Sequence, residues 1–278
     1  VVCPLRANFL QPLHPHLRMK WLQEVGLEWT NYLGREIRRS ADGSFDLRMK
    51  PGYYARVAEL VGLDSAKPYA MPLQSLPTEE PDSPALPESK AVTYRTVIGK
   101  LLWCSPIRLD LTFATRELSR HVSKPREVDG ARLRHVVKYL RGSGDMALQL
   151  KLGEIGEVGV GKDVRVLAYT DASWGSSPGY RSVSGGILVA DGVLISYYSR
   201  TQSVISLSST EAELIALAAM ASETIFLKNL LLEMGATPRV TVYCDNRASV
   251  AITARRGPGR IKHMSLRVLW LQDQMRDK

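Results

Sequence analysis

The stretch VRVLAYTD, Val164 to Asp171, decides the fold because it is an apolar run that ends in one carboxylate. Such a run is typical of a central strand, and we expect it to deliver Asp171 to a site at the sheet edge. Glu213 lies in the opening turns of a later helical segment, and Asp245 ends a second β-rich run, RVTVYCD. Carboxylates from two strand ends and a helix can meet at one edge and hold a pair of hard divalent cations. The sequence therefore predicts a two-metal site.

The segments that follow VRVLAYTD predict an α/β unit with a mixed sheet and flanking helices. GGILVA and VLISYYS flank Asp191 and Gly192, a pair that favours the type I′ turn of a hairpin. A long helix follows, in which Ser208 and Glu211 have the spacing of a capping box and Gly235 marks the end. RVTVYCD predicts a fourth strand, NRASVAITA a short helix, RRGPGR a basic loop and HMSLRVLWLQDQM a final amphipathic helix.

Composition favours a polyanionic partner and excludes several classes of protein. Lys and Arg number 37 against 28 Asp and Glu, which suits binding to nucleic acid. Cys3, Cys104 and Cys244 lie far apart without a CxxC pairing, so neither a disulfide framework nor a zinc module is indicated. Membrane insertion is not expected, because no apolar run reaches the roughly 18 residues of a membrane span.

The chain divides into six expected segments. They are a leader or truncated end (1–20), a small α+β unit (21–73), a Pro-rich linker (74–92), a helical segment (93–150), a Gly-rich spacer (151–163) and the α/β unit (164–278). Asp42-Gly43 predicts a hairpin in the α+β unit, and Pro51 suits the first turn of its helix.

Three helical patterns fill the segment 93–150. They run over about 93–104, over 111–122 with Asp110 as the expected N-cap, and over 127–141 with Gly142 as the stop. The last pattern carries several basic residues, including Arg132 and Lys138. These form either a solvated helix face or a contact with a nucleic-acid backbone.

A cluster of motifs resembles the reverse transcriptase and ribonuclease H region of copia-type LTR retrotransposon Pol polyproteins. The residues that carry the resemblance downstream are YTDASW (169–174), RSVSGGILV (181–189), LSSTEAELIAL (207–217), YCDNRASVAI (243–252) and RIKHMSLRVLWLQ (260–272). Upstream, YLGREIRR, YRTVIGKLLW, LTFATRELSRHVSKP and HVVKYLRGSGD are also similar to that family. The resemblance covers the chain from about residue 21 to its end.

The resemblance implies a ribonuclease H-like fold for 164–278, preceded by a reverse transcriptase remnant. Residues 21–73 would be the end of the palm with a thumb-like unit, and residues 93–150 the thumb or connection segment. The implied activity is that of a metal-dependent endonuclease, which hydrolyses the RNA strand of RNA–DNA hybrids with two Mg²⁺ or Mn²⁺ ions. Implied partners are the hybrid, single-stranded nucleic acid and the remainder of the Pol polyprotein. The expected location is intracellular, in a cytoplasmic particle or the nucleus.

By motif position, Asp171, Glu213 and Asp245 would be the catalytic, metal-binding acids. Glu211 is a rival for the helix position, but we favour Glu213 because Glu211 stands three residues after Ser208 and can cap the helix. Each acid also has a structural interpretation: Asp171 can simply end a strand, and Asp245 can cap the following helix.

The sequence departs from the family pattern near its end. Ser265 stands where the family usually carries a fourth acid, and a neutral hydroxyl cannot supply that charge. DASW also has Ser173 where the family has a second Asp. His263 is a possible accessory residue in proton transfer or product release, with a structural role as the alternative.

Four basic residues beside the expected site would contact phosphates: Arg255, Arg256, Arg260 and Lys262. The paired aspartates of a polymerase are missing, since no two adjacent Asp residues occur in the sequence. We expect a ribonuclease H-type hydrolase that is not a polymerase by itself. The alternative is a catalytically impaired nucleic-acid-binding remnant of a retroelement. A sugar kinase on a similar sheet is disfavoured because no Gly-rich phosphate motif lies beside the first strand.

Overall fold

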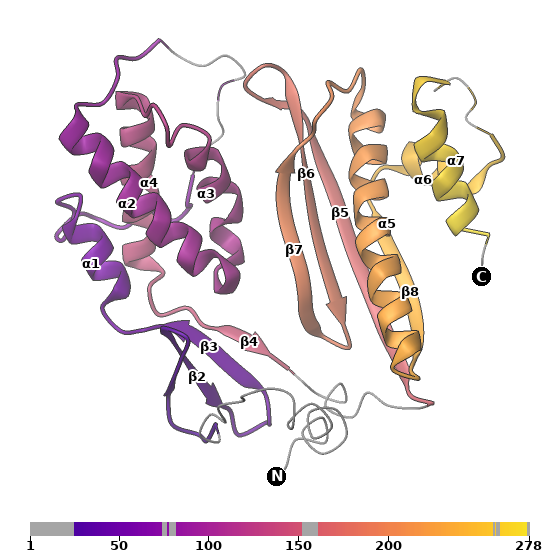
Figure 1. Cartoon of the computed structure of the whole chain (residues 1–278), viewed down its shortest axis with the longest axis horizontal. Coiled ribbons are helices and arrows are strands. Elements are labelled where there is room, and N and C mark those ends of the chain that lie inside the picture. The colour runs from indigo at the N-terminus through magenta and orange to yellow at the C-terminus, as the bar shows by residue number, and fades with distance from the viewer. Residues whose placement is uncertain are drawn as a thin grey trace, which may run out of the picture.

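The computed structural model describes residues 25–73, 77, 82–151, 161–257, 259 and 262–276. The leader predicted over 1–20 lies outside these residues, as do parts of the predicted linker and spacer. The described chain contains two four-stranded sheets with flanking helices, so the predicted mixed α/β class is confirmed (Figure 1).

The first unit is an antiparallel sheet beside a helical layer. Its elements are β1 (Thr30–Tyr32), β2 (Arg35–Arg39), β3 (Phe45–Met49), α1 (Tyr53–Glu59), α2 (Glu88–Cys104), the 3₁₀ turns η2 (Ser105–Ile107) and η3 (Leu109–Leu111), α3 (Thr112–Ser119), α4 (Glu127–Gly142) and β4 (Leu148–Leu150). The strand order is β1-β2-β3-β4, so the last strand returns to pair with β3. One apolar cluster extends from Met49 to Leu140, and the strands and helices thus share a core.

Two predicted helix starts in this unit were wrong. α1 begins at Tyr53, because Gly52 has a φ of 75° and a left-handed residue cannot continue a right-handed helix from Pro51. α2 begins at Glu88, directly after Pro87, and not at Thr93. The residues between Glu88 and Thr93 are therefore the first turn of the helix and not part of a linker.

Asp110 was also wrongly expected to cap α3, which begins at Thr112 and has no side-chain cap. Its carboxylate instead accepts hydrogen bonds from Arg108 Nε at 2.9 Å, Arg108 Nη2 at 2.7 Å and Tyr139 Oη at 2.7 Å. Burial opposes ionisation of Asp110, but these donors hold its pKa below the usual range. The Arg108 side chain is only 2% exposed and requires this partner.

The second unit is a mixed sheet crossed by one long helix. Its elements are β5 (Asp163–Ser177), β6 (Arg181–Ala190), β7 (Val193–Thr201), α5 (Ser209–Glu233), β8 (Thr237–Cys244), α6 (Arg247–Ala254), η5 (Lys262–Met264) and α7 (Ser265–Gln274). The strand order is β7-β6-β5-β8, with antiparallel pairs except for the parallel pair of β5 and β8. Parallel strands need a long crossover connection, and α5 supplies it.

Local signals around β6, β7 and α5 were predicted correctly. Asp191 and Gly192 both have positive φ, 45° and 85°, as the type I′ turn requires. Ser208 caps α5 by accepting a hydrogen bond from the Glu211 backbone N–H at 3.3 Å. Gly235, with a φ of 80°, follows the end of the helix.

α5 packs along the sheet with Val166, Ala168 and Met220 in one buried cluster, while its opening turns pack on α7 (Figure 1). By length and composition alone α5 could also cross a membrane. A core helix passes the same test, and the contacts of α5 with the sheet account for its apolar residues.

The two units meet where α3 packs against β7. The Tyr197 hydroxyl donates to the Ser105 carbonyl, and Arg116 donates to the Thr201 hydroxyl. These contacts place the sheet face opposite α5 toward the helical layer of the first unit (Figure 1).

We predict that Asp110→Asn destabilises the protein by about 3 kcal/mol, because it leaves the buried Arg108 guanidinium without its charge partner. Urea unfolding followed by circular dichroism measures the change. Asp145→Asn, at an exposed position three residues beyond α4, is the control and should stay within about 0.5 kcal/mol of wild type. Equal effects of the two substitutions would contradict the assigned role of Asp110.

Candidate functional site

The register of β5 and β8 brings two of the predicted acids to neighbouring positions. Thr170 of β5 pairs with Cys244 of β8 in the parallel ladder. Asp171 and Asp245 each follow one member of that pair, so both lie one step further along, and both are exposed. β5 does not end at Asp171 as expected. It continues to Ser177 because it remains paired with β6.

Glu213 approaches the same place from the first turns of α5. Its side chain is buried, with 5% exposed. The Ala172 backbone N–H donates to Glu213 Oε1 at 3.1 Å, and the Cys244 thiol lies 3.9 Å from Glu213 Oε2. The helix acid is thus anchored to β5 on one side and faces the end of β8 on the other.

The electrostatic state of Glu213 reflects this crowding. Burial raises the pKa of Glu213 to about 7, and the negative charges of Asp171 and Asp245 push in the same direction. The Ala172 N–H opposes the shift only in part. A cation placed among these groups would favour the ionised carboxylate.

One tight group of possible metal ligands occurs among the described residues. Oxygen atoms of Glu213 and Asp245 and the sulfur of Cys244 all lie within 4.8 Å of one another. Asp171 lies outside that group, although its charge acts on Glu213. Cys244 directly precedes Asp245 but was not predicted as a site residue, because the partner of its thiol lies 31 positions away in the sequence.

Glu211 has a different role from Glu213. Its Oε2 accepts a hydrogen bond at 2.7 Å from the backbone N–H of Leu207, one residue before the N-cap Ser208 that a capping box would use, so Glu211 still ties down the start of the helix. His263 Nε2 lies 3.0 Å from Glu211 Oε1, so this histidine contacts the cap and ties η5 to α5. Asp245 does not cap α6. Asn246 does, by accepting from the Ser249 N–H at 2.9 Å.

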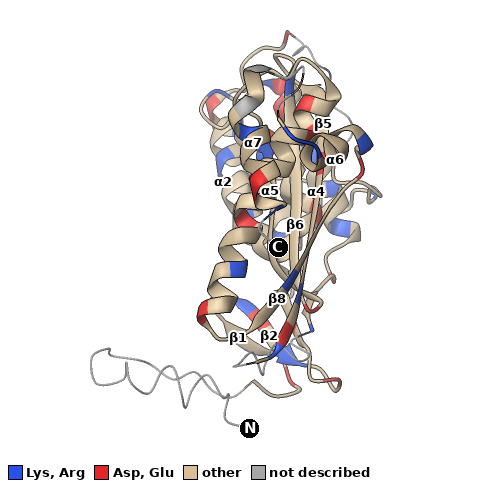
Figure 2. Cartoon of the chain, turned by 90° about the vertical axis from the view of Figure 1, so that its right-hand side faces the viewer, with Lys and Arg blue, Asp and Glu red and all other residues tan. Residues whose placement is uncertain are grey.

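The predicted basic residues have different surroundings. Arg132 is paired with the buried Asp129 at 3.4 Å, and Lys138 donates to Tyr69 Oη at 3.3 Å. Both therefore have intramolecular partners, and their contact with nucleic acid stays a prediction. Arg255 and Arg256 are exposed after α6. Viewed from the side of α5 and α7, basic segments are interspersed with acidic ones (Figure 2).

Three further predicted residues are only partly open to description. Arg260 lies outside the described residues. Lys262 begins η5 and Ser265 begins α7, but their side chains are not described.

A cavity of about 340 Å³ adjoins Asp171 on the sheet face opposite α5, between that face and the start of α3. Tyr169, Ile187 and Phe113 are among its lining residues. Tyr169 also stacks on Tyr243, with ring centroids 5.0 Å apart. Two exposed tyrosines thus lie next to the acids: Tyr169 stands two residues before Asp171, and Tyr243 stands two residues before Asp245.

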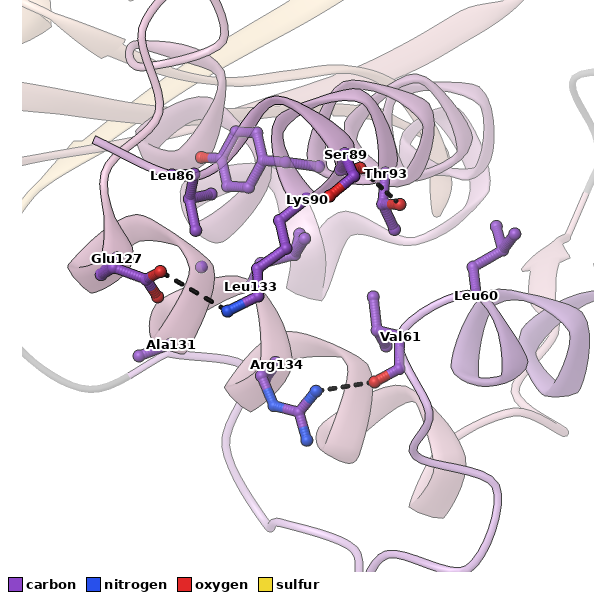
Figure 3. A pocket seen from close by; sticks show the side chains of 12 residues that line it. Leu60, Val61, Leu86, Ser89, Lys90, Thr93, Glu127, Ala131, Leu133 and Arg134 are labelled. Atoms are coloured by element: carbon purple, nitrogen blue, oxygen red, sulfur yellow. Dashed lines mark hydrogen bonds and ion pairs between the residues drawn. The ribbon is translucent and has the colours of Figure 1, made fainter. Parts of the chain in front are cut away.

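A larger cavity, of about 440 Å³, lies in the first unit between α1, α2 and α4 (Figure 3). Its charged groups are already used: Lys90 pairs with Glu127 at 3.5 Å, and Arg134 donates to the Val61 carbonyl at 2.6 Å. None of the predicted catalytic acids lines it, so the smaller cavity is the one related to the acidic site.

Comparison with known proteins identifies the origin of the chain. It is 30% identical over 236 residues to the retrovirus-related Pol polyprotein from transposon TNT 1-94 of Nicotiana tabacum. The aligned region covers 81% of this chain and 17% of that protein. It is 30% identical over 252 residues to the Pol polyprotein from transposon RE2 of Arabidopsis thaliana, with 88% and 16% covered. The chain belongs to the copia-type retrotransposon Pol family.

The chain is also similar to a shorter transposon protein. The putative transposon Ty5-1 protein YCL074W of Saccharomyces cerevisiae is 30% identical over 199 residues, which is 70% of this chain and 59% of that protein. No protein-family model matches the chain. The chain spans less than a fifth of the length of the two plant Pol polyproteins, and its retroelement origin is established by these matches.

The raised pKa of Glu213 predicts how stability depends on pH in metal-free buffer. Between the ordinary value of 4.5 and about 7, the folded chain holds a proton that the unfolded chain releases. The resulting stabilisation is complete below the unfolded pKa and is lost as pH rises through the folded pKa. Glu213→Gln mimics the protonated acid, so it should match wild type near pH 5 and be the more stable protein near pH 8.

Urea unfolding in EDTA across this pH range tests the prediction. Glu233→Gln, at the exposed end of α5, is the matched control and should follow wild type throughout. A Glu213→Gln curve parallel to that of wild type would show that Glu213 titrates normally.

Proposed function

We propose that residues 164–278 form a ribonuclease H-like domain that hydrolyses the RNA strand of RNA–DNA hybrids. The element order supports this proposal, since three antiparallel strands are followed by a crossover helix and a parallel fourth strand. Membership of the Pol family supports it as well. The observation that carries the proposal is the buried carboxylate of Glu213 close to Asp171, which lies within β5, and to Asp245, which directly follows β8.

The donor set fits a hard divalent cation. Carboxylate oxygens are the ligands that Mg²⁺ and Mn²⁺ prefer. Burial, and after it repulsion from Asp171 and Asp245, raises the Glu213 pKa, and a bound positive charge would offset both effects. Asp171, Glu213 and Asp245 would hold a pair of these ions, which would supply an activated water and stabilise the leaving 3′ oxygen of the ribose.

The protein's own groups orient the site and leave it accessible. The Ala172 N–H holds Glu213 Oε1, so the other oxygen faces the end of β8. Asp171 and Asp245 are exposed at the end of the parallel ladder between β5 and β8. A long duplex can therefore reach them without entering an enclosed cavity, which suits a hybrid better than a small molecule.

Contacts with the nucleic-acid backbone would come from the basic segment after α6. Arg255 and Arg256 are exposed there, and Arg260 and Lys262 follow in the sequence. Phosphate contacts of this kind position a duplex without reading its sequence. The other domains of a Pol polyprotein are the remaining proposed partners.

A second candidate function is binding without turnover. Two observations favour it: Ser265 stands at the position of the family's fourth acid, and Asp171 lies outside the tight ligand group. In this case the protein would be an impaired nucleic-acid-binding remnant. Restoration of cleavage by Ser265→Asp would support this alternative.

The direct test is cleavage of a hybrid labelled on its RNA strand in the presence of Mg²⁺ or Mn²⁺. Glu213→Gln should lower the rate by at least about 100-fold, or roughly 3 kcal/mol of transition-state stabilisation. Glu211→Gln is the matched control because glutamine keeps the capping hydrogen bond, and its rate should remain within a few-fold of wild type.

The outcomes separate the two candidate functions. No cleavage by wild type above the Glu213→Gln background would refute the nuclease proposal. Hybrid binding with no cleavage would favour the remnant, whereas a larger loss for Glu211→Gln than for Glu213→Gln would mean that the helix acid is wrongly assigned.

Binding to the hybrid should weaken as salt concentration rises, because phosphate contacts release counterions. The logarithm of the association constant for the hybrid falls linearly with the logarithm of the salt concentration. We predict that Arg256→Gln makes this negative slope shallower by about 0.7 to 0.9, the contribution of one phosphate contact. Fluorescence anisotropy in EDTA measures this without cleavage. Lys67→Gln, at an exposed position in the first unit, should leave the slope unchanged, and an unchanged slope for Arg256→Gln would exclude this arginine from the interface.

A further inference from the structure

We propose that Cys244 is a third ligand at the acidic site and that Glu213, Cys244 and Asp245 together bind Zn²⁺. The proposal rests on the proposed function in that it uses two of the same carboxylates. It adds a sulfur donor, which a site for Mg²⁺ alone does not need. The site would differ from a zinc finger, since its ligands come from one thiol and two acids.

The geometry of the three side chains is the first argument. Two oxygen donors and one sulfur donor lie within 4.8 Å of one another. Ligand atoms about 2.0 to 2.3 Å from a tetrahedral Zn²⁺ are separated by somewhat less than this, so small side-chain rotations would suffice. Three protein ligands also leave one position open for water, as in catalytic zinc sites.

The second argument concerns the buried oxygen of Glu213. One carboxylate oxygen, Oε1, has the Ala172 N–H as its partner. Among the described residues, the other oxygen, Oε2, has only the Cys244 thiol as a partner, at 3.9 Å, although the side chain is 5% exposed. A thiol at that distance is a weak donor, and a carboxylate oxygen with so poor a partner is costly to bury. A metal ion between the oxygen and the sulfur would satisfy both.

The chemistry of the donors decides which cation is favoured. Mg²⁺ takes oxygen ligands in an octahedral arrangement and gains little from sulfur. Zn²⁺ accepts thiolate and carboxylate in one tetrahedral site, and it binds mixed sites more tightly than Mn²⁺. On binding, a Zn–S bond forms and the thiol proton passes to solvent. We therefore expect Zn²⁺ to displace Mg²⁺ and Mn²⁺ from this site.

Cys104 provides an internal comparison. Its thiol is fully buried in the apolar cluster of the first unit, and it donates to the Leu101 carbonyl at 3.2 Å. Burial raises its pKa to about 11, and no second ligand group accompanies it among the described residues. A metal–thiolate signal from this protein should therefore depend on Cys244 and not on Cys104.

Co²⁺ titration of the purified full chain, without nucleic acid, tests the proposal. Co²⁺ is a spectroscopic substitute for Zn²⁺, and sulfur coordination gives a thiolate-to-metal absorption band. We expect the band in wild type and Cys104→Ala, its loss in Cys244→Ser, and its bleaching by Zn²⁺ but not by Mg²⁺. Loss of a residue that only hydrogen-bonds to a metal ligand typically weakens metal binding by ~10- to 100-fold. Cys244→Ser should weaken Zn²⁺ binding by more than this, because it removes a ligand itself.

Circular dichroism confirms that each variant is folded before titration. A band that survives in Cys244→Ser, or a wild type with no band at any Co²⁺ concentration, would overturn the proposal. Glu213→Gln and Asp245→Asn should each weaken Zn²⁺ binding, and unchanged affinity in both would overturn it as well. Because these measurements need no substrate, their outcome is independent of whether the protein cleaves hybrids.

Discussion

The parallel pairing of β5 with β8 is the constraint on which the second unit depends. Two parallel strands cannot be joined by a tight turn, so the chain must cross the sheet before β8 can form. The 25-residue α5 makes that crossing and covers one face of the sheet. The same pairing aligns Thr170 with Cys244. It thereby places the next residue of each strand, Asp171 and Asp245, side by side where the parallel ladder ends.

Glu213 shows what this arrangement does to a single side chain. A carboxylate in the first turns of a surface helix would be solvated, but here the start of α5 lies against β5 and the end of β8. The result is an acid that is 5% exposed, held by one backbone N–H and surrounded by negative charge. Its ionisation and any bound cation are therefore coupled, because each favours the other.

The first unit is joined to this sheet from the opposite face. α3 contacts β7, and the cavity between them reaches Asp171. Arg108 is central to the stability of that region, since Asp110 and the Ser143 carbonyl both accept hydrogen bonds from its buried guanidinium. Asp171 and Tyr169 thus share a cavity with the start of α3, although both residues belong to the second unit.

The sequence alone determined those features that depend on a few adjacent residues. Asp191-Gly192 specified its turn because both residues adopt the positive φ that a type I′ turn requires. Ser208 specified the start of α5 because its hydroxyl reaches the third N–H of the helix. Local patterns also gave the position of Glu213 in the first turns of α5 and of Asp245 directly after β8, whereas β5 continues past Asp171 because it stays paired with β6. The tertiary structure decided the rest. Asp110 found Tyr139 and Glu213 found Cys244, partners 29 and 31 positions away, and local patterns do not encode such distant contacts. The Glu213 pKa is raised mainly by burial, which depends on residues distant in the sequence. The same packing of α5 against the end of β8 places the Cys244 thiol close to the carboxylates of Glu213 and Asp245.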